Sequence, residues 1–400
     1  MIQCKNYING QFTGSRGETL ERRNPANTQE VVGVINQSGE DEINNAVSVA
    51  RNAFPAWRAI SRVRRGEYLD RLVQVLKRET ESFSRLVARE MGKNINEATA
   101  EVTEGIHMVQ YVVGTARTPF GDVVSSEIAE KDSFMRRKPK GVVAAITPWN
   151  FPFAIPFWLI APSVAEGNTV VFKPSKETSC TAQKLAECVH EVGFPPGVIN
   201  FIYGSGEKCG MPLVRHPDIP VVLFTGSAEI GQQIRKVCAE FPDKMCACEM
   251  GGKNAIIVLD DADMNLAVNA SVISAYKTSG QRCTAASRII VHKNRLKEFE
   301  KKFVEMSKRI RIGDPLDQNM FTGPLVNETQ MNKVLNYNQL AKDEGARVLL
   351  GGARLTQGKL ANGYFLSPFV YRMTHNTKSR VLREEVFGPH VSIIPVNDLY

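Results

Sequence analysis

The sequence predicts an α/β protein with a doubly wound parallel sheet, a second α/β domain and a small β hairpin. Length is the first reason, because 400 residues exceed what one simple core accommodates. The second is that short apolar runs alternate with amphipathic segments between Gly141 and Glu249, a pattern typical of a parallel sheet covered by helices. A similar series follows Gly251 and Gly252, where we place a domain boundary.

The N-terminal part predicts short strands followed by helices. We expect strands at residues 7–12 and 31–35. From Asp41 to about Gly114 the apolar residues recur at helical spacing, and glycine and proline are sparse. We interpret these helices as scaffold.

Residues 119–138 predict an antiparallel hairpin. Val123 and Val124 belong to one short strand, Phe134 and Met135 belong to the other, and a polar turn joins them. A hairpin of this kind needs a partner to cover its apolar face.

The region from Gly141 onward predicts a regular succession of strands and helices. We expect strands at residues 142–146, 169–173, 198–203, 221–224 and 244–249, and helices at 179–192, 209–216 and 228–239. The second domain is expected to contain strands at 255–259 and 288–291, a helix at 264–276 and a further helix ending near Arg309. The predicted domains are residues 1–118 with 139–251, the hairpin 119–138, and residues 252–400.

Composition excludes several classes of protein. The apolar fraction of 43% and the charged fraction of 23% are ordinary for a soluble protein. The longest apolar stretch, residues 151–164, contains three prolines and is shorter than the ~20 residues that span a bilayer. The N-terminus lacks an apolar signal sequence, and the net charge of +8 is spread without a nucleic-acid-binding motif. We expect a cytoplasmic protein with no membrane or nucleic-acid partner.

The eight cysteines do not follow a metal-binding pattern. They lack paired CxxC motifs at zinc spacing and an accompanying histidine cluster, so we expect reduced thiols and no metal site. Most are expected to be small core residues. Cys246 and Cys248 predict a buried strand just before Glu249, and Cys283 alone has a reactive context.

Three residues suggest chemistry at a carbonyl group. Cys283 lies between a predicted helix and an apolar β-run, and we expect its thiol to be presented rather than buried. Glu249 lies upstream, before two glycines, and Asn150 lies in a proline-flanked loop. A thiol, a carboxylate and an amide can attack a carbonyl, activate water for deacylation and hold an oxyanion. The structural alternatives are an inert buried cysteine, a salt-bridged glutamate and a turn asparagine.

The motifs around these residues resemble those of the aldehyde dehydrogenase superfamily, in the same order and along nearly the whole chain. They are residues 148–152, 249–253, 280–284 and 384–389, with Met250 replacing the leucine of the family's Glu-Leu-Gly-Gly-Lys. The resemblance implies that Cys283 attacks a small aldehyde, and that hydride leaves for a nicotinamide cofactor as a thioester forms. It implies Glu249 as the base for thioester hydrolysis. It also implies Asn150 as an oxyanion donor beside the backbone N–H of Cys283.

The resemblance implies a Rossmann-like cofactor domain for NAD or NADP. Gly226 and Ser227 lie where a strand meets a helix whose N-terminus can receive a phosphate. The nearby stretch 204–210 has the spacing GxGxxxG, one residue longer than the dinucleotide motif. The other residues that the resemblance assigns to the cofactor are Trp149, Lys173, Ser175, Lys176, Glu385 and Phe387.

Lys176 departs from the pattern of NAD-preferring members, which often carry a glutamate there to bind the ribose 2′-OH. A cation at this position attracts a 2′-phosphate. Glu177 follows immediately and can take the role of that glutamate. The preference between NAD and NADP therefore stays open, with Lys176 favouring NADP or dual use.

The resemblance also bears on substrate and assembly. It implies that Phe153 and Trp158 line the aldehyde tunnel, and that Arg282 can bind a distal carboxylate, as in semialdehyde-oxidising relatives. Glu249 argues against the alternative of a CoA-acylating enzyme, and the three catalytic residues together argue against a non-catalytic structural member. The hairpin matches the family's oligomerisation flap, which implies a homodimer or homotetramer. Family members continue past residues 384–389, so we expect this chain to be truncated at its C-terminal end.

Overall fold

The computed structural model describes residues 1–397, and the chain divides into two compact units. The first unit comprises Met1–Arg22, Gly33–Phe83 and Thr99–Glu249, and the second comprises Arg23–Val32, Ser84–Ala98 and Met250–Tyr400. The main division falls beside the predicted boundary at Gly251. The two N-terminal segments of the second unit have no counterpart in the prediction.

The first unit is built on a seven-stranded sheet with the order β12-β11-β8-β9-β10-β2-β3. Strands β8 to β11 pair in parallel, whereas β2 and β3 extend the sheet as an antiparallel hairpin. The strands are β2 Asn6–Ile8, β3 Gln11–Thr13, β8 Val142–Ile146, β9 Thr169–Lys173, β10 Ile199–Phe201, β11 Val221–Gly226 and β12 Met245–Met250.

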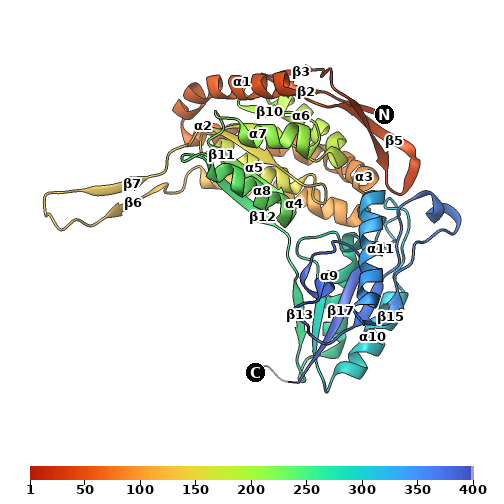
Figure 1. The fold of residues 1–400 in the computed structure, drawn as a ribbon. Coiled ribbons are helices and arrows are strands. Elements are labelled where there is room, and N and C mark those ends of the chain that lie inside the picture. Colours follow the sequence, from red (N-terminus) through yellow and green to blue (C-terminus); the bar gives the residue numbers. More distant parts are fainter. Residues whose placement is uncertain (398–400) are drawn as a thin grey trace. The chain divides into compact units, whose positions relative to one another are not determined.

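Helices surround this sheet, as Figure 1 shows in red to green. They are α1 Glu40–Ala59, α2 Arg62–Arg78, α4 Ile95–Thr115, α5 Ala154–Ala165, α6 Ser179–Val192, α7 Met211–Arg215 and α8 Ala228–Ala239. Helix α3 Thr80–Met91 belongs to the second unit from Ser84 onward, and the first four residues of α4 belong to it also. Helices α1, α7 and α8 share one hydrophobic cluster with strand β8, while α5 packs on β8 and β9 outside that cluster. Helices on both faces of a parallel sheet confirm the predicted α/β class.

Two strand predictions in this unit are wrong. Residues 7–12 form a hairpin rather than one strand, because Asn9 and Gly10 adopt φ values of 54° and 79° and turn the chain between β2 and β3. Strand β12 is not buried. It is an edge strand whose residues are alternately half-buried and exposed, because it has a neighbour on one side only.

The predicted hairpin is present as β6 Gly121–Val124 and β7 Ser133–Arg136, and it extends from the first unit as a long ribbon (Figure 1). Its apolar side chains are exposed, including Val123 at 88% and Phe134 at 63%. A small sheet of β1 Ile2–Cys4, β4 Thr19–Asn24 and β5 Asn27–Asn36 completes the N-terminal region.

The second unit contains a five-stranded sheet with the order β13-β14-β17-β16-β15, parallel except for β15. Its core includes the aromatic side chains of Tyr276, Phe299 and Phe303. No helix among residues 1–397 is both long and apolar enough to cross a membrane. The elements are β13 Ala255–Val258, α9 Met264–Tyr276, β14 Arg288–His292, α10 Leu296–Lys308, α11 Glu328–Asp343, β15 Arg347–Gly351, β16 Phe369–Arg372, α12 Arg380–Arg383 and β17 His390–Val396.

Candidate active site

Cys283 lies in the loop between α9 and β14 of the second unit. The Asp263 side chain caps the start of α9 by accepting hydrogen bonds from two backbone N–H groups, and the helix ends at Tyr276. Cys283 itself is half-buried, as are Cys246 and Cys248, while the other five cysteines are buried. Exposure alone therefore does not distinguish Cys283 from Cys246 and Cys248.

A left-handed turn precedes the cysteine. Thr278 and Ser279 both adopt a φ of 54°, and Gly280 follows with a φ of 68°. Three consecutive residues in this region are unusual, above all with a β-branched threonine among them. Gly280 also has no room for a side chain, since a Cβ would lie 2.3 Å from the carbonyl oxygen of Gly388. This contact brings the cysteine loop against the Glu385–Gly388 segment within the same unit.

The 322–326 loop holds the middle of the turn through one side chain and two backbone groups. Ser279 donates its backbone N–H to the hydroxyl of Thr322 at 2.7 Å and its own hydroxyl to the Gly323 carbonyl at 2.6 Å. The buried amide of Gln281 donates to the Thr278 carbonyl and accepts from the Val326 N–H. These bonds fix a backbone conformation that would otherwise be disfavoured.

Glu97, near the start of α4, contacts both ends of the turn. Its carboxylate accepts from the Thr278 backbone N–H at 3.0 Å and from the Thr278 hydroxyl at 2.9 Å, and it forms an ion pair with Arg282. The Arg282 Nε also donates to the Thr278 hydroxyl at 2.9 Å. The Arg282 guanidinium thus has partners within the protein, which favours a positioning role over the predicted binding of a substrate carboxylate.

Asn254 links the cysteine loop to the glycines that follow Glu249. Its amide donates to the carbonyl oxygens of Cys283 and Ala285, at 2.6 Å and 3.2 Å. Three residues earlier, Gly251 leaves space for the carboxylate of Glu385, which would lie 2.0 Å from a Cβ at position 251. The sequence alone predicted no role for Asn254, although this residue directly follows the motif at 249–253.

The Glu385–Phe387 segment is also held in a defined conformation. Phe387 adopts a φ of 62°, and the Gln330 side chain on α11 donates to the carbonyl oxygens of Val386 and Phe387. Burial raises the pKa of Glu385, although the Gly252 backbone hydrogen bond opposes the shift. Burial also lowers the pKa of the neighbouring Lys253 to about 7.

Glu249 and Asn150 belong to the first unit. Glu249 is exposed on β12, and among residues 1–397 no ion pair engages its carboxylate. This excludes the salt-bridged alternative. Asn150 is buried in the loop between β8 and α5. The Glu101 carboxylate fixes the end of that loop, because it accepts from the backbone N–H groups of Phe153 and Ala154 at 2.8 Å and 3.3 Å.

Phe153 is a core residue, so the prediction that it lines the aldehyde tunnel is wrong. Its side chain is fully buried, with its ring 4.8 Å from Phe83 and 5.2 Å from Phe157 between centroids. A Cβ at Gly105 would approach the Phe153 ring to 2.6 Å, so the ring is enclosed on that side also. Trp158 on α5 is 37% exposed and stays a candidate.

The N-terminus of α8 has the features expected of a phosphate site. Ser227 is exposed and caps the helix, accepting from the Ile230 N–H at 3.4 Å. Gly226 has no room for a side chain, since a Cβ would lie 2.4 Å from the Phe224 ring. The exposed N–H groups of this 12-residue helix can bind an anion.

The residues after β9 divide into buried and exposed groups. Lys173 is buried and donates to the Pro174 carbonyl at 2.9 Å, and burial lowers the pKa of its ammonium group. Ser175 accepts from the Glu177 N–H. The Glu177 carboxylate pairs with Arg22 at 2.9 Å, whereas Lys176 is exposed and has no ion-pair partner within residues 1–397. Trp149, the other cofactor candidate here, is half-buried.

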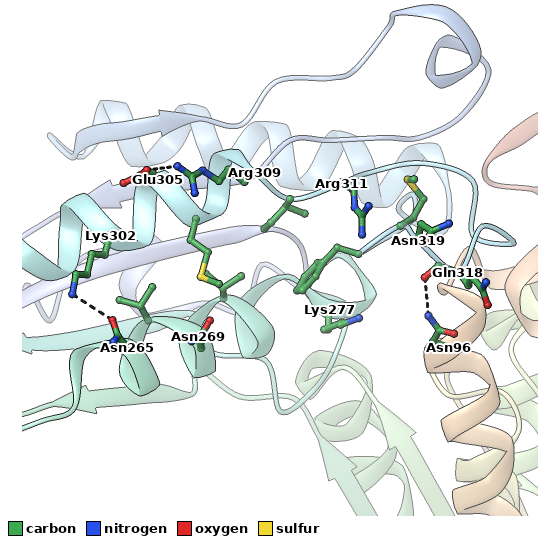
Figure 2. Close-up of a pocket in the computed structure, with 16 residues that line it drawn as sticks. Asn96, Asn265, Asn269, Lys277, Lys302, Glu305, Arg309, Arg311, Gln318 and Asn319 are labelled. Carbon is green, nitrogen blue, oxygen red and sulfur yellow. Dashed lines mark hydrogen bonds and ion pairs between the residues drawn. The ribbon is translucent and has the colours of Figure 1, made fainter.

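A separate cavity of about 680 Å³ lies in the second unit, between α9, α10 and the loop that ends near Phe321. Figure 2 shows its polar lining, including Asn269, Lys277 and Arg311. None of the predicted site residues lines it. Lys277, the first residue of the loop after α9, lines the cavity, but Cys283 does not.

Comparisons with known proteins agree with the motifs. The sequence model of the aldehyde dehydrogenase family matches residues 12–400. An alpha-ketoglutaric semialdehyde dehydrogenase of Bacillus subtilis (strain 168) is 38% identical over 395 residues, which cover 98% of this chain and 80% of that protein.

Solved structures of similar proteins share the fold. A betaine aldehyde dehydrogenase from Staphylococcus aureus in complex with NAD+ is 33% identical with a TM-score of 0.95, covering 98% of this chain and 78% of that one. A putative aldehyde dehydrogenase from Burkholderia cenocepacia is 34% identical with a TM-score of 0.95, covering 100% of this chain and 81% of that one.

Proposed function

The chain belongs to the aldehyde dehydrogenase family, and from that premise we propose which of its residues oxidise an aldehyde to a carboxylic acid. The observation that carries the proposal is the cysteine loop. Cys283 follows a left-handed turn fixed by buried hydrogen bonds, next to the segment that contains Glu385 and Phe387. Such a fixed loop suits a nucleophile, which must be held in one geometry.

Cys283 is the nucleophile in this proposal. Its thiolate attacks the aldehyde carbon to give a thiohemiacetal, whose oxyanion accepts hydrogen bonds from the Asn150 amide and the Cys283 backbone N–H. A bound nicotinamide supplies the hydride acceptor that makes this an oxidation. The carbonyl oxygen of Cys283 accepts a hydrogen bond from the Asn254 amide at 2.6 Å, which holds the backbone at the nucleophile.

Glu249 completes the reaction as general base. It takes a proton from water, and the resulting hydroxide hydrolyses the Cys283 thioester and releases the acid. An exposed carboxylate without an ion pair suits this role, because it can accept a proton from water without first breaking a salt bridge. The same residue distinguishes this protein from a CoA-acylating enzyme, in which CoA accepts the acyl group.

The cofactor residues fit a dinucleotide. The free N–H groups at the start of α8, beside Gly226 and Ser227, suit a phosphate. Lys173 and Ser175 follow β9, where the adenosine ribose is expected, and Trp149 is expected near the cofactor. Glu385 and Phe387 are the candidates for the nicotinamide half. The similar Staphylococcus aureus enzyme was solved with NAD+, and this supports NAD as a cofactor here.

Lys176 leads us to propose that NADP is also used. Glu177 is the residue that could otherwise bind the ribose 2′-OH, but its carboxylate is paired with Arg22. Lys176 has no ion-pair partner within residues 1–397. Replacing Lys176 with glutamate should shift the ratio of kcat/KM for NADP over NAD toward NAD by about ten-fold or more, since it removes an attraction and adds a repulsion. Steady-state kinetics with both cofactors measure this ratio.

Glu177→Gln is the matched variant for this test. It should leave the cofactor ratio within about two-fold of wild type, because the structure engages this carboxylate with Arg22. An unchanged kcat/KM ratio in Lys176→Glu, together with a lower kcat/KM for NAD in Glu177→Gln, would show that Glu177 and not Lys176 contacts the ribose.

We propose a carboxylate-bearing semialdehyde as the substrate. The support is the similarity to a semialdehyde dehydrogenase and a cationic chain with a net charge of +8. A panel of semialdehydes and neutral aldehydes of equal length, assayed with NAD and with NADP, tests this. We expect kcat/KM to be at least about ten-fold higher for the charged series, as a charge-assisted hydrogen bond would give. Equal values would refute the substrate class, and no oxidation of any aldehyde would refute the assignment of residues.

The assembly and location are proposed on separate grounds. The exposed apolar side chains of β6 and β7 suit a contact with another copy of the chain, as a homodimer or homotetramer. The cysteines at all eight positions are free thiols, and this supports a reducing compartment such as the cytoplasm.

A further inference from the structure

We propose that Glu97 is a positioning residue for Cys283, and that its buried carboxylate holds the left-handed turn from which the thiol is presented. This inference rests on the proposed role of Cys283 as nucleophile. Glu97 and the cysteine loop both belong to the second unit, and they are separated by more than 180 residues in the sequence.

The turn needs an external support. Thr278 and Ser279 both have positive φ values, in a region that L-residues with side chains rarely adopt. A threonine is especially disfavoured there, because its branched Cβ crowds the backbone. The conformation persists only if surrounding groups determine it, and Thr278 is 2% exposed, so water does not supply those groups.

Glu97 supplies the supporting groups at the start of the turn. One carboxylate oxygen accepts from the Thr278 backbone N–H at 3.0 Å, and the other accepts from the Thr278 hydroxyl at 2.9 Å. Both polar groups of Thr278 that can donate are thus bonded to one side chain. Bonds to an ionised acceptor in a buried site are stronger than bonds between neutral groups, and the Glu97 side chain is only 7% exposed.

The same carboxylate reaches the other end of the turn through Arg282. The Arg282 guanidinium pairs with Glu97, and its Nε donates to the Thr278 hydroxyl at 2.9 Å. Glu97, Thr278 and Arg282 therefore form a closed set of hydrogen bonds, and Cys283 is the next residue. A change in the carboxylate is expected to loosen both ends of the turn and to move the thiol.

Glutamine at position 97 tests the role of the charge at nearly constant volume. Its amide has one acceptor oxygen, whereas the Glu97 carboxylate has two in use, so its NH₂ group must face a donor. Asn254 and the Gln281 amide would still hold the rest of the loop. The variant is therefore expected to fold while the turn becomes less ordered.

The experiment measures the reactivity of Cys283 directly. Wild type and Glu97→Gln are treated with iodoacetamide without aldehyde, and alkylation of the Cys283 peptide is followed by mass spectrometry. We expect alkylation to slow by about ten-fold, with a similar fall in kcat for each titrated active site, while KM for aldehyde and Kd for cofactor stay within about two-fold. A loss of folded enzyme alone would lower the number of active sites and not the rate at each site.

Glu300→Gln is the matched control. Glu300 on α10 pairs with Arg372 on β16 in the same unit, with side-chain exposures of 15% and 29%, close to the 7% and 26% of Glu97 and Arg282. We expect it to leave Cys283 alkylation unchanged. Arg282→Lys is a second test, because it keeps the charge and loses the Nε bond to Thr278, and it should slow alkylation by about three-fold.

Three results would overturn the inference. The first is wild-type alkylation in both Glu97→Gln and Arg282→Lys. The second is an equal loss in Glu300→Gln. The third is a raised KM for the semialdehyde with unchanged kcat, which would assign Arg282 to the substrate. If wild type itself oxidises no aldehyde, the proposed function fails instead, and the alkylation rates still report on the turn.

Discussion

Replacing Cys283 with alanine is expected to abolish aldehyde oxidation while leaving cofactor binding nearly intact. The physical reason is that Cys283 alone supplies the covalent step, whereas the proposed cofactor contacts come from other residues. Absorbance of the reduced cofactor measures the oxidation, and quenching of protein fluorescence measures cofactor binding. The loss should reach at least about three orders of magnitude, as for other enzymes that lose a nucleophile.

Cys246→Ala is the control for this variant. Cys246 is also half-buried, but it lies on β12 and has no assigned role in the reaction. It should retain aldehyde oxidation close to the wild-type rate. Residual oxidation above a few per cent in Cys283→Ala, or a loss of the same size in Cys246→Ala, would remove the assignment of Cys283 as nucleophile.

Glu249→Gln is expected to slow hydrolysis of the acyl-enzyme more than its formation. Glutamine cannot take a proton from water, so the thioester should accumulate. A rapid burst of reduced cofactor, roughly equal in amount to the active sites, should precede a steady state slower by about two to four orders of magnitude. Stopped-flow absorbance resolves the two phases.

Asp243→Asn controls for the loss of an exposed carboxylate near the same edge strand. Asp243 is exposed and lies two residues before β12, so its amide variant should show normal steady-state turnover. If Glu249→Gln loses the burst as well, Glu249 also activates the Cys283 thiol, and its role extends beyond hydrolysis.

The sequence predicted the regular elements well because their signals are local. The strands at 142–146 and 169–173 and the helices at 179–192 and 228–239 have the bounds that their apolar runs and capping residues indicate. The turn at Asn9 was missed although Asn-Gly is a hairpin signal. Strand β12 was misjudged because its burial depends on its place at the sheet edge, which the local pattern does not encode.

The site was predicted only in part, because some of its contacts join residues that are far apart in the sequence. Motifs indicated the loops of Cys283 and Glu385, which the structure brings into contact through Gly280 and Gly388. The partner of Arg282 was not predictable, because Glu97 lies 185 residues away and resembles any helical glutamate in the sequence. Phe153 was misassigned because an aromatic residue next to a catalytic loop can face either the core or the substrate.

The most direct test of the account is to identify the acyl-enzyme by mass spectrometry. Glu249→Gln is mixed with a semialdehyde and the oxidised cofactor, quenched in acid and digested. We expect the mass of the acyl group on the peptide that contains Cys283, with none on the peptides of Cys246 or Cys248, and no adduct in Cys283→Ala. An enzyme that releases reduced cofactor with no acyl group on Cys283 would contradict the proposed covalent mechanism.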